Sequence, residues 1–403
     1  MTHASAPRQP SIDLLRAVAI TLMVIVHFVE NLSGWYGTDG GPFAGSQRTW
    51  WLPAGFAAPI FTFLTGTSYR IWLRVQQQRH RSDDSITKAT VRRGLLLFGL
   101  GFVFNVLVWL PEDVFNWDVL TLIGTAMLAL AGLRSAPDGV ILAAAALAVA
   151  LTPPLQSAAG YLEYWAQGYF DYEFTLADVT LGWLVVGYFP LFPWLAFPLV
   201  GYALGPVVFE TEGTVPRRWP LAIGGGLIVA AVAAIAAWQA GSFLTPLTPL
   251  SPWTMFPPSL AYLLGTIGGV VVAGTAAHAT IDRDPDRWQW LINWATPLSR
   301  HALSVYLLHH IVHVWPLWAY GAATGADPTA HWQIALHPST SLGLAIAFMA
   351  AASLLFHWME RRRVASVETL MRWLCDEPAA PRSSRGQSDQ SRCSKAVRQP
   401  EDC

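Results

Sequence analysis

The sequence predicts an all-α, polytopic transmembrane helix bundle, and its composition and the lengths of its apolar runs lead to this prediction. Of the 403 residues, 53% are hydrophobic and only 13% are charged, whereas charged residues make up about a quarter of a typical soluble domain. The mean hydropathy is +0.37. The apolar residues are gathered in runs that approach or reach the roughly 20 residues a helix needs to cross a bilayer. We therefore expect most of the chain to lie in a membrane.

Ten apolar runs are candidate spans, and the third, fourth and fifth of them are short. Each run is predicted to form a helix, and an even number of spans places both ends of the chain on the same side of the membrane. The candidate spans cover approximately residues 12–32, 53–73, 94–110, 118–134, 138–154, 181–207, 220–239, 259–279, 300–319 and 339–359.

Basic residues predict which loops face the cytoplasm, because cytoplasmic loops concentrate Lys and Arg. Alternate loops hold nearly all of these residues, whereas the opposite loops are acidic and contain Arg48 as their single basic residue. We therefore expect both termini in the cytoplasm and the protein in the plasma (inner) membrane. The basic residues of the predicted cytoplasmic loops are Arg74, Arg79, Arg81, Lys88, Arg92, Arg93, Arg134, Arg217, Arg218, Arg283, Arg287 and Arg361 to Arg363.

Three regions follow from this arrangement: a cytoplasmic N-terminus over residues 1–11, a transmembrane domain over 12–374 and a tail over 375–403. The first ten residues are too few and too polar for a signal peptide, so the first span is expected to remain as an anchor. The tail is rich in Ser, Arg, Gln, Asp and Pro and is predicted to be disordered. A cytoplasmic tail disfavours disulfides and a cysteine metal site, and it holds all three cysteines, Cys375, Cys393 and Cys403.

Charge and motifs exclude several classes of function. The net charge is −1, and no basic stripe with interleaved aromatic residues is present, so nucleic-acid binding is not expected. The sequence contains no Gly-x-Ser-x-Gly nucleophile motif and no phosphate-binding Gly-x-x-x-x-Gly-Lys-Ser/Thr motif.

The first span carries ionisable residues along one face of its predicted helix. Arg16 and His27 are eleven residues apart, which is almost three helical turns and roughly 16 Å along the helix axis. Asp13 lies one turn before Arg16, and Glu30 lies one turn after His27. Because an ionisable residue inside a membrane is energetically expensive, this face indicates a functional site.

The two ends of this face suit different chemistry. The guanidinium group of Arg16 offers a fixed fork of donors for phosphate, whereas His27 can accept and return a proton near neutral pH. In the predicted orientation Arg16 lies toward the cytoplasm and His27 toward the outside, which fits a coenzyme A thioester with cytoplasmic phosphates. Two structural alternatives stay open: Arg16 reaches the interface and pairs with Asp13, and His27 forms only an interhelical hydrogen bond.

The ninth span contains a second group of polar residues. His309 and His313 are four residues apart, which places them on one helix face at metal-ligand spacing. No carboxylate or cysteine lies nearby in the sequence as a third ligand, so we predict no metal site. Tyr306 and His310 are also four residues apart, and they either face a central site or form interhelical hydrogen bonds of modest energy.

Other segments are expected to shape a cavity. The sixth span contains Gly187–Trp194 with two prolines, each of which removes a backbone donor and disturbs the preceding turn. This predicts either a broken helix lining a cavity or a simple proline kink. On the outer side, the long aromatic segments 34–51 and 153–180 are expected to form a lid.

Several motifs taken together resemble a known enzyme family. They are Asp13–Arg16 followed by His27, Ala58–Gly66, Arg92–Leu97, Phe115–Gly124 and Tyr188–Trp194. In this order they resemble the bacterial relatives of heparan-alpha-glucosaminide N-acetyltransferase. The segment Ser304–His309 is similar to a late helix of the broader membrane acyltransferase family three.

This resemblance implies transfer of an acetyl or other acyl group from a coenzyme A thioester to a sugar amine or hydroxyl across the membrane. It also implies a catalytic histidine near the outer end of the bundle. The sequence departs from the animal enzyme, whose catalytic histidine belongs to the first luminal loop, because residues 34–51 contain no histidine. His27 matches instead the Arg-x10-His pattern of the broader membrane acyltransferases.

The resulting hypothesis assigns a role to each candidate residue. His27 is the general base, a role that contributes about 10²–10⁴-fold to rate, and Glu30 or His309 orients its ring. Acyl-CoA serves as co-substrate without a permanently bound cofactor. The expected partners are acyl-CoA, a glycan or other sugar acceptor and the lipid bilayer, and whether the protein forms a homo-oligomer stays open. Arg16, with Arg92 or Arg93 nearer the surface, is assigned to the phosphates of the donor, and Asp13 beside Arg16 belongs to the same donor-binding group.

A transporter or permease with a polar central pathway is the alternative function. The prolines of the sixth span and the histidines within the membrane favour it. The absence of an internal repeat argues against it, as does the position of Arg16 near one face.

Overall fold

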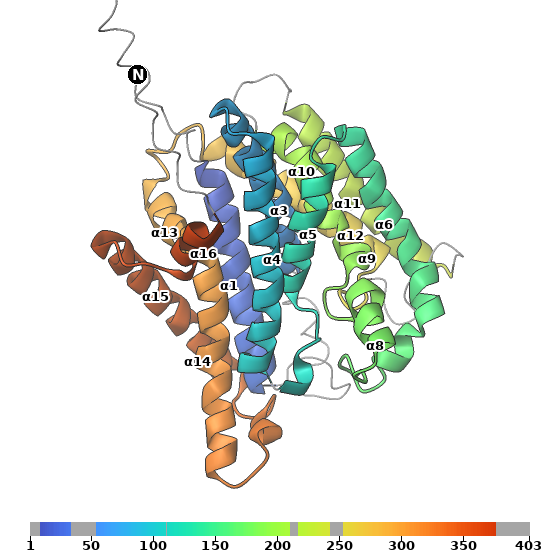
Figure 1. Ribbon diagram of the computed structural model, residues 1–403, viewed down its shortest axis with the longest axis vertical. Helices are drawn as coiled ribbons and strands as arrows, with labels where there is room; N and C mark the ends of the chain where they lie inside the picture. Colours follow the sequence, from blue (N-terminus) through green and yellow to red (C-terminus); the bar gives the residue numbers. More distant parts are fainter. Residues whose placement is uncertain (1–8, 34–53, 110, 210–216, 242–252, 376–403) are drawn as a thin grey trace, which may run out of the picture.

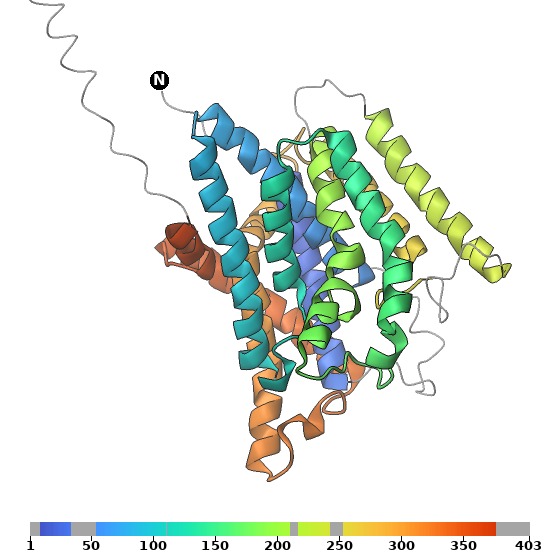
Figure 2. The same cartoon turned by 45° about the vertical axis from the view of Figure 1, so that its right-hand side comes forward.

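Helices run through the whole part of the chain that the structure describes, which is residues 9–33, 54–109, 111–209, 217–241 and 253–375 of this computed structural model. In these ranges no strand is present, and a single isolated bridge joins Met255 and Pro258. The helices lie side by side in one bundle (Figures 1 and 2). The all-α prediction is confirmed.

Long helices alternate with short helical segments along the chain. In chain order the elements are α1 (Pro10–Ser33), η1 (Ala54–Phe56), α3 (Ala57–Gln78), α4 (Asp83–Val108), η2 (Pro111–Asp113), α5 (Val119–Leu133), α6 (Asp138–Ala159), α7 (Tyr161–Tyr164), α8 (Leu176–Leu181), η3 (Gly182–Val186), α9 (Leu191–Trp194), α10 (Ala196–Phe209), α11 (Arg218–Gln239), α12 (Leu260–Thr280), α13 (Gln289–Arg300), α14 (Ala302–Ala323), η4 (Pro328–His331), α15 (Pro338–Arg362) and α16 (Val367–Cys375).

The bundle is that of a multi-pass membrane protein. Within the described residues, seven helical segments are long and apolar enough to cross a membrane: α1, α4, α6, the segment Leu176–Phe209, α11, α12 and α15. The remaining three predicted spans fall on α3, α14 and the shorter apolar helix α5. Each of the ten predicted spans thus coincides with a helix, while the number that cross the membrane stays a prediction.

The direction of the helices gathers the basic loops at one end of the bundle. The connections between α3 and α4 and between α5 and α6 lie at the same end as the start of α1 (Figure 1). His27, near the other end of α1, is therefore far from these basic loops. This arrangement agrees with the alternation of charge in the sequence, and the cytoplasmic location of the termini stays a prediction.

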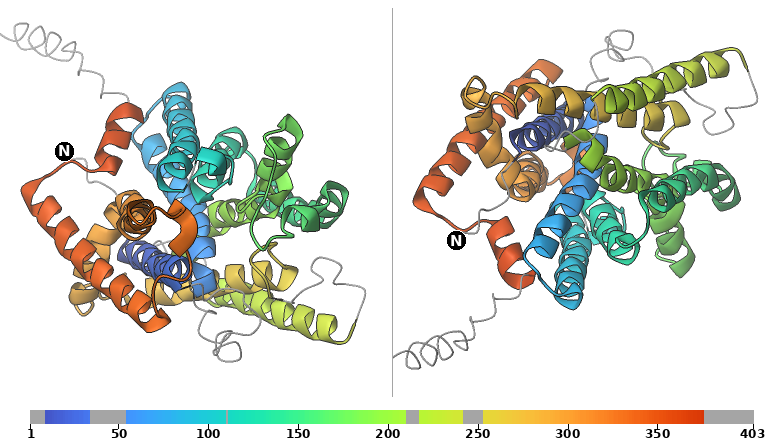
Figure 3. Two further views of the ribbon diagram at one scale, coloured as in Figure 1. Left: turned by 90° about the horizontal axis from the view of Figure 1, so that it is seen from below. Right: turned by 90° about the horizontal axis from the view of Figure 1, so that it is seen from above.

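The first helix occupies the centre of the bundle. It packs against α3, α12, α13, α14 and α15, whereas α11 and α15 lie at opposite edges (Figure 3). Its first turn is anchored to the end of α12, because the backbone N–H and the hydroxyl of Ser11 both donate to the Asp282 carboxylate, at 2.8 and 2.6 Å. The polar face of α1 is consequently held inside the protein rather than toward lipid.

The end of α1 is also held by backbone hydrogen bonds. The connection between α14 and α15 donates from the Gln333 N–H to the Asn31 carbonyl and from the Leu336 N–H to the Leu32 carbonyl, each at 2.8 Å. These bonds satisfy carbonyl groups that a helix leaves without a partner at its last turn.

The sixth predicted span is broken, as the prolines indicated. α8 passes into the π-helical segment η3, and Phe192 in α9 has non-helical backbone angles before α10 begins. The N–H groups of Tyr188 and Phe189 in the unwound part donate to the carbonyls of Asn116 and Trp117, at 3.2 and 2.9 Å. These bonds allow irregular backbone to lie inside the bundle, where unsatisfied groups would be costly. A cavity along this segment stays a prediction.

Close helix contacts depend on glycine. A Cβ atom at Gly66 of α3 would lie 1.9 Å from the Pro198 carbonyl oxygen, and one at Gly201 of α10 would lie 2.0 Å from the Phe63 carbonyl oxygen. Neither helix has room for a side chain at this crossing. Small residues let helix backbones approach closely in membrane proteins, so these two glycines fix the packing of α3 on α10.

Several predicted boundaries need correction. The fifth span was expected to end at residue 154, but α6 continues to Ala159 with Pro153 and Pro154 inside it, so the first residues of the predicted lid are helical. The tail was expected to begin at residue 375, but Cys375 is the buried last residue of the amphipathic helix α16. The lid segment 34–51 and residues 376–403 lie outside the described residues.

Candidate functional site

The histidines of two helices that are far apart in the sequence meet near the end of α1. The Nδ1 atom of His27 lies 2.9 Å from the Nε2 atom of His309 on α14. Their rings are nearly parallel, with centroids 5.2 Å apart and an interplanar angle of 11°. The structure thus brings together the two histidines that the sequence hypothesis placed in one site.

The hydrogen-bond partners of His309 determine which nitrogen carries the proton in each neutral ring. The Nδ1 atom of His309 lies 3.1 Å from the Val305 carbonyl oxygen, which can only accept, so we infer that Nδ1 carries the hydrogen. The Nε2 atom of His309 is then an acceptor, and Nδ1 of His27 must donate to it. The lone pair of His27 is therefore on its Nε2 atom.

Two further histidines complete the cluster. The His310 ring lies against His309 and His27, with centroids 4.1 and 4.6 Å apart, and its buried Nδ1 atom has no hydrogen-bond partner among the described residues. His313 is fully bonded: its Nδ1 atom donates to the His309 carbonyl at 2.5 Å, and its Nε2 atom lies 2.8 Å from the Asn31 amide nitrogen. We infer that His313 is structural and that His310 faces the site.

Aromatic side chains surround His310. Phe104 and Trp109 of the α4 end lie 5.1 and 5.5 Å from its ring centroid. Tyr306, one turn earlier on α14, donates from its hydroxyl to the Asp118 carboxylate at 3.0 Å. Asp118 in turn caps α5, since it accepts from the Leu120 and Thr121 N–H groups. These contacts fix the wall of the site against α4 and α5.

The histidine cluster also resembles a metal-binding group in its geometry. One nitrogen from each of His27, His309 and His310 lies within 4.8 Å of the others, and three histidines are a known zinc ligand set. The sequence pointed to the pair His309 and His313, whereas the observed group contains His310 in place of His313 and takes His27 from another helix. In the observed arrangement a metal would have to replace the hydrogen bond between His27 and His309. The expected absence of a metal stays a prediction.

Glu30 is placed one turn beyond His27 on α1. Among the described residues, no hydrogen bond joins its carboxylate to a histidine of the cluster, whereas His309 contacts His27 directly. His309 is therefore the better candidate to orient the His27 ring, and the role of Glu30 stays a prediction.

The other end of the α1 face is a compact polar cluster. Arg16 donates to the Ser299 hydroxyl of α13 at 2.9 Å and to the Ser68 hydroxyl of α3 at 2.7 Å. Ser299 in turn donates its hydroxyl hydrogen to the Asp13 carboxylate at 2.7 Å. The Arg16 guanidinium group lies 4.0 Å from the same carboxylate. The alternative in which Arg16 pairs with Asp13 therefore has support, although 23% of the Arg16 side chain stays exposed.

The two arginines of α4 differ in their surroundings. The Arg93 guanidinium group lies over the Trp72 ring, 5.0 Å from its centroid, whereas Arg92 is exposed. Trp72 follows Ser68, the partner of Arg16, by one turn of α3, a rise of about 6 Å. Arg93 therefore lies near the level of Arg16 along α3, whereas Arg92 points to the surface.

Sequence reasoning did not identify Asn31 and gave His310 only a general role. Asn31 lies four residues after His27, so the two share a helix face, and this spacing was the available signal. Its amide oxygen also accepts from the Trp332 indole at 3.2 Å. That contact depends on the connection after α14, which no local pattern predicts.

Comparison with known proteins identifies the family. Residues 8–226 match the model of a protein family described as "Heparan-alpha-glucosaminide N-acetyltransferase, catalytic". The matched stretch includes Arg16 and His27 but ends before α14, which carries His309. A search of curated proteins finds no match. Because the matched stretch is more than half of the chain, the protein belongs to the family of the heparan-alpha-glucosaminide N-acetyltransferase catalytic domain, a family of membrane acyltransferases.

Proposed function

We propose that the protein transfers an acetyl or other small acyl group from a coenzyme A thioester to a sugar amine or hydroxyl across the membrane, with His27 as general base. One observation carries this proposal. The hydrogen bonds from His27 to His309 and from His309 to the Val305 carbonyl leave the lone pair of His27 on Nε2. A nitrogen fixed in this way is suited to accept a proton from an incoming nucleophile.

The reaction then follows a simple sequence of proton transfers. His27 Nε2 takes the proton of the sugar amine or hydroxyl while that group attacks the thioester carbonyl. The carbon–sulfur bond breaks, the coenzyme A thiolate leaves, and the proton returns from His27 to the sulfur. His309 accepts from Nδ1 of His27 throughout and so keeps the ring oriented, as the third member of a catalytic triad does.

Direct transfer and an acyl-histidine intermediate both use the same atom. In the second route His27 Nε2 attacks the thioester itself, and the sugar then takes the acyl group from the ring. The geometry supports either route, because both need a free lone pair on Nε2.

Arg16 is proposed to bind phosphates of the donor at the other end of α1. It lies eleven residues before His27, roughly 16 Å along the helix axis, and part of its side chain is exposed. A long donor molecule can therefore contact Arg16 with its phosphates while its thioester lies deeper, near His27. Asp13 would hold Arg16 in place through Ser299, and Arg93 lies near the same level of α3.

The opposite end of the bundle supports binding of a sugar acceptor. Tyr172 donates to the Glu112 carbonyl at 2.5 Å and Tyr164 donates to Asp178 at 2.6 Å. Burial raises the pKa of each of these tyrosines to about 12, so both stay protonated near neutral pH. Exposed carboxylates at Glu163, Asp171 and Glu173 lie on the same segment and offer acceptors for sugar hydroxyl groups.

The transporter alternative has less support. The broken helix that favoured it has its freed backbone donors bonded to Asn116 and Trp117, and the family is one of acyltransferases. Binding of acetyl-CoA by the purified protein, followed as a thermal shift, separates the two functions, since a transporter for another solute would show no stabilisation.

The decisive test is acyl transfer from labelled acetyl-CoA to amino sugars in purified membranes. We expect His27→Ala to lower turnover by about 10²–10⁴-fold, the usual contribution of a general base. His357→Ala is the matched control, because His357 lies in α15 and bonds to the Ser353 carbonyl of its own helix. Unchanged turnover in the His27 variant would remove His27 from the mechanism.

A further inference from the structure

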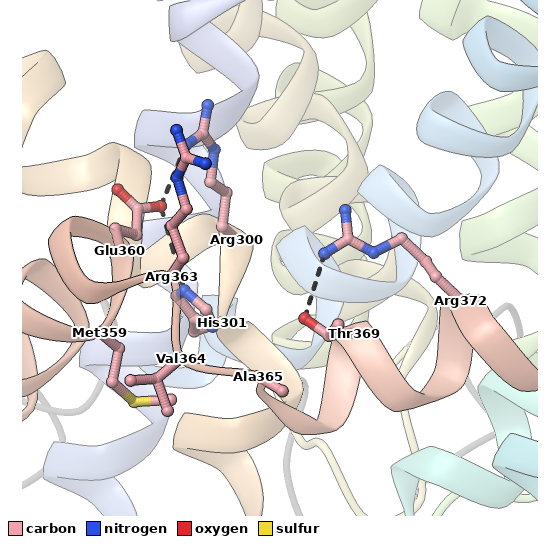
Figure 4. A pocket seen from close by; sticks show the side chains of 9 residues that line it. All are labelled: Arg300, His301, Met359, Glu360, Arg363, Val364, Ala365, Thr369 and Arg372. Atoms are coloured by element: carbon pink, nitrogen blue, oxygen red, sulfur yellow. Dashed lines mark hydrogen bonds and ion pairs between the residues drawn. The ribbon is translucent and has the colours of Figure 1, made fainter.

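A basic pocket lies where the ends of α13 and α15 meet α16 (Figure 4). Its volume is about 480 Å³, large enough for a phosphorylated sugar or a headgroup. Its wall combines three arginines and a histidine with a single carboxylate. The residues that line it are Arg300, His301, Met359, Glu360, Arg363, Val364, Ala365, Thr369 and Arg372.

The carboxylates around the pocket already have partners. Arg300 donates to Glu360 at 3.1 Å. Glu368 of α16 accepts from the Ser304 N–H and hydroxyl at 2.8 and 2.7 Å, which holds α16 against the start of α14. Within the described residues, neither Arg363 nor Arg372 has a carboxylate within 4.0 Å. Neither arginine is therefore paired with a carboxylate, and Arg372 instead donates to the Glu368 carbonyl at 3.3 Å and to the Thr369 hydroxyl at 3.4 Å.

Two further features indicate that the pocket is a binding site. His301 is only 8% exposed and stacks on Phe356 with ring centroids 4.8 Å apart. Its buried Nδ1 atom has no hydrogen bond to any described residue and lies 3.6 Å from the Glu368 carboxylate. Arg363 ends α15 with a positive φ of 54°, a backbone conformation that is uncommon for residues other than glycine. Its side chain lies beside those of Arg300 and Glu360 (Figure 4).

The pocket is next to the polar cluster around Arg16. Arg16 donates to Ser299, and Ser299 is followed directly by Arg300 and His301 of the pocket wall. α13 also packs along α1. The pocket and the Arg16 cluster are therefore connected through the last turn of α13.

We propose that this pocket binds the phosphorylated adenosine end of the acyl-CoA donor, with Arg363 and Arg372 as ligands of its 3′-phosphate. Arginine is suited to this role because its planar fork of donors matches a phosphate group. The proposal rests on the proposed function, since it names the part of the donor that the site near Arg16 leaves unbound. An anionic phospholipid headgroup has the same phosphate chemistry, and the test separates the two sources.

The test uses adenosine 3′,5′-bisphosphate, which carries no thioester and needs no catalysis. The full-length protein is placed in nanodiscs of phosphatidylcholine, and binding is measured by isothermal titration calorimetry. We expect the Kd to rise about tenfold for Arg363→Gln and for Arg372→Gln, the effect of losing one charge-assisted contact. Arg361→Gln removes the same charge from an exposed position outside the pocket and should bind as the wild type does.

Dephospho-CoA provides a second readout of the 3′-phosphate. The wild type should bind acetyl-CoA more tightly than dephospho-acetyl-CoA, and the double variant Arg363→Gln/Arg372→Gln should lose this preference. Retention of the preference would overturn the proposal. Circular dichroism and size-exclusion chromatography of each variant confirm that the bundle is folded.

Two comparisons keep the outcomes distinct. The His27→Ala variant should bind the bisphosphate normally, so a failed catalytic role for His27 and a failed pocket assignment give different results. Nanodiscs with added phosphatidylglycerol test the lipid alternative. If the arginine variants change retention of phosphatidylglycerol while bisphosphate binding stays as in the wild type, the pocket is a headgroup site and the proposal is wrong.

Discussion

The two ends of the polar face of α1 look alike in the sequence but differ in how their charges are satisfied. At one end Arg16 bonds to two serines and lies beside Asp13, so the cluster is largely complete in itself. At the other end His27 uses one nitrogen to contact His309 and keeps the lone pair of the other. A buried polar group that is satisfied stabilises the fold, whereas one with a spare lone pair can carry chemistry.

This difference predicts which substitutions affect catalysis and which affect stability. Changes near His27 should lower turnover in a folded protein, and changes near Asp13 should destabilise the bundle. Substitutions at each end of the helix test this division.

Among substitutions that leave the proposed base His27 in place, the largest effect is expected at His309. His309→Leu removes the acceptor for the His27 Nδ1–H, so kcat should fall about 10²-fold, within the range for general base catalysis, while KM for acetyl-CoA stays unchanged. His309→Gln can place a carbonyl oxygen near the position of Nε2 and should retain more activity. Steady-state kinetics on both variants check this. Equal losses in the two variants would contradict a positioning role for His309.

A smaller effect, on stability, is expected at Asp13. Asp13→Ala removes the acceptor of the Ser299 hydroxyl and the carboxylate beside Arg16. The free energy of unfolding should fall by about 2 kcal/mol, as for the loss of a buried hydrogen bond to a charged group. Thermal unfolding in detergent measures this. Glu30→Ala is the comparison at the other end of the helix. If Glu30→Ala lowered the free energy of unfolding more than Asp13→Ala does, the Asp13 end of α1 would not be the stabilising end.

The effect expected at Arg16 is a change in donor affinity. Arg16→Ala should raise the Kd for acetyl-CoA about tenfold, because one charge-assisted phosphate contact is lost. Arg16→Lys retains the charge but loses the planar fork of donors, so its Kd for acetyl-CoA should lie between those of the wild type and Arg16→Ala. Titration calorimetry provides the values. An unchanged Kd in the alanine variant would mean that Arg16 serves the fold alone.

The smallest effect is expected from metal removal. If the histidines act through the hydrogen bond between His27 and His309, treatment with a chelator should leave acyl transfer unchanged. Elemental analysis of the purified protein should find less than one zinc ion per chain. Stoichiometric zinc with loss of activity on chelation would favour a metal site at His27, His309 and His310.

Much of the fold could be predicted because apolar runs, basic loops and prolines act locally. The ten candidate spans all coincide with helices, and the break near Phe192 follows from the prolines beside it. The amphipathic helices α13 and α16 were missed because they are too short for a span. The end of α6 was placed too early, since Pro153 and Pro154 are accommodated inside the helix.

The candidate site could be predicted only in part. The sequence alone predicted that Arg16 and His27 share one helix face and that α14 is polar. The contact between His27 and His309 joins residues separated by 282 positions, and helix packing alone determines it. For the same reason, three converging histidines could not be distinguished in the sequence from two histidines at metal-ligand spacing.

The most direct test of the catalytic role of His27 is a measurement of its tautomer. Nitrogen NMR of the histidine-labelled protein in nanodiscs, with His27→Gln to assign the signal, reports which ring nitrogen carries the hydrogen. We predict a neutral His27 protonated on Nδ1 with a bare Nε2, and loss of this preference in His309→Leu. A His27 ring protonated on Nε2 in the wild type would contradict its role as the base.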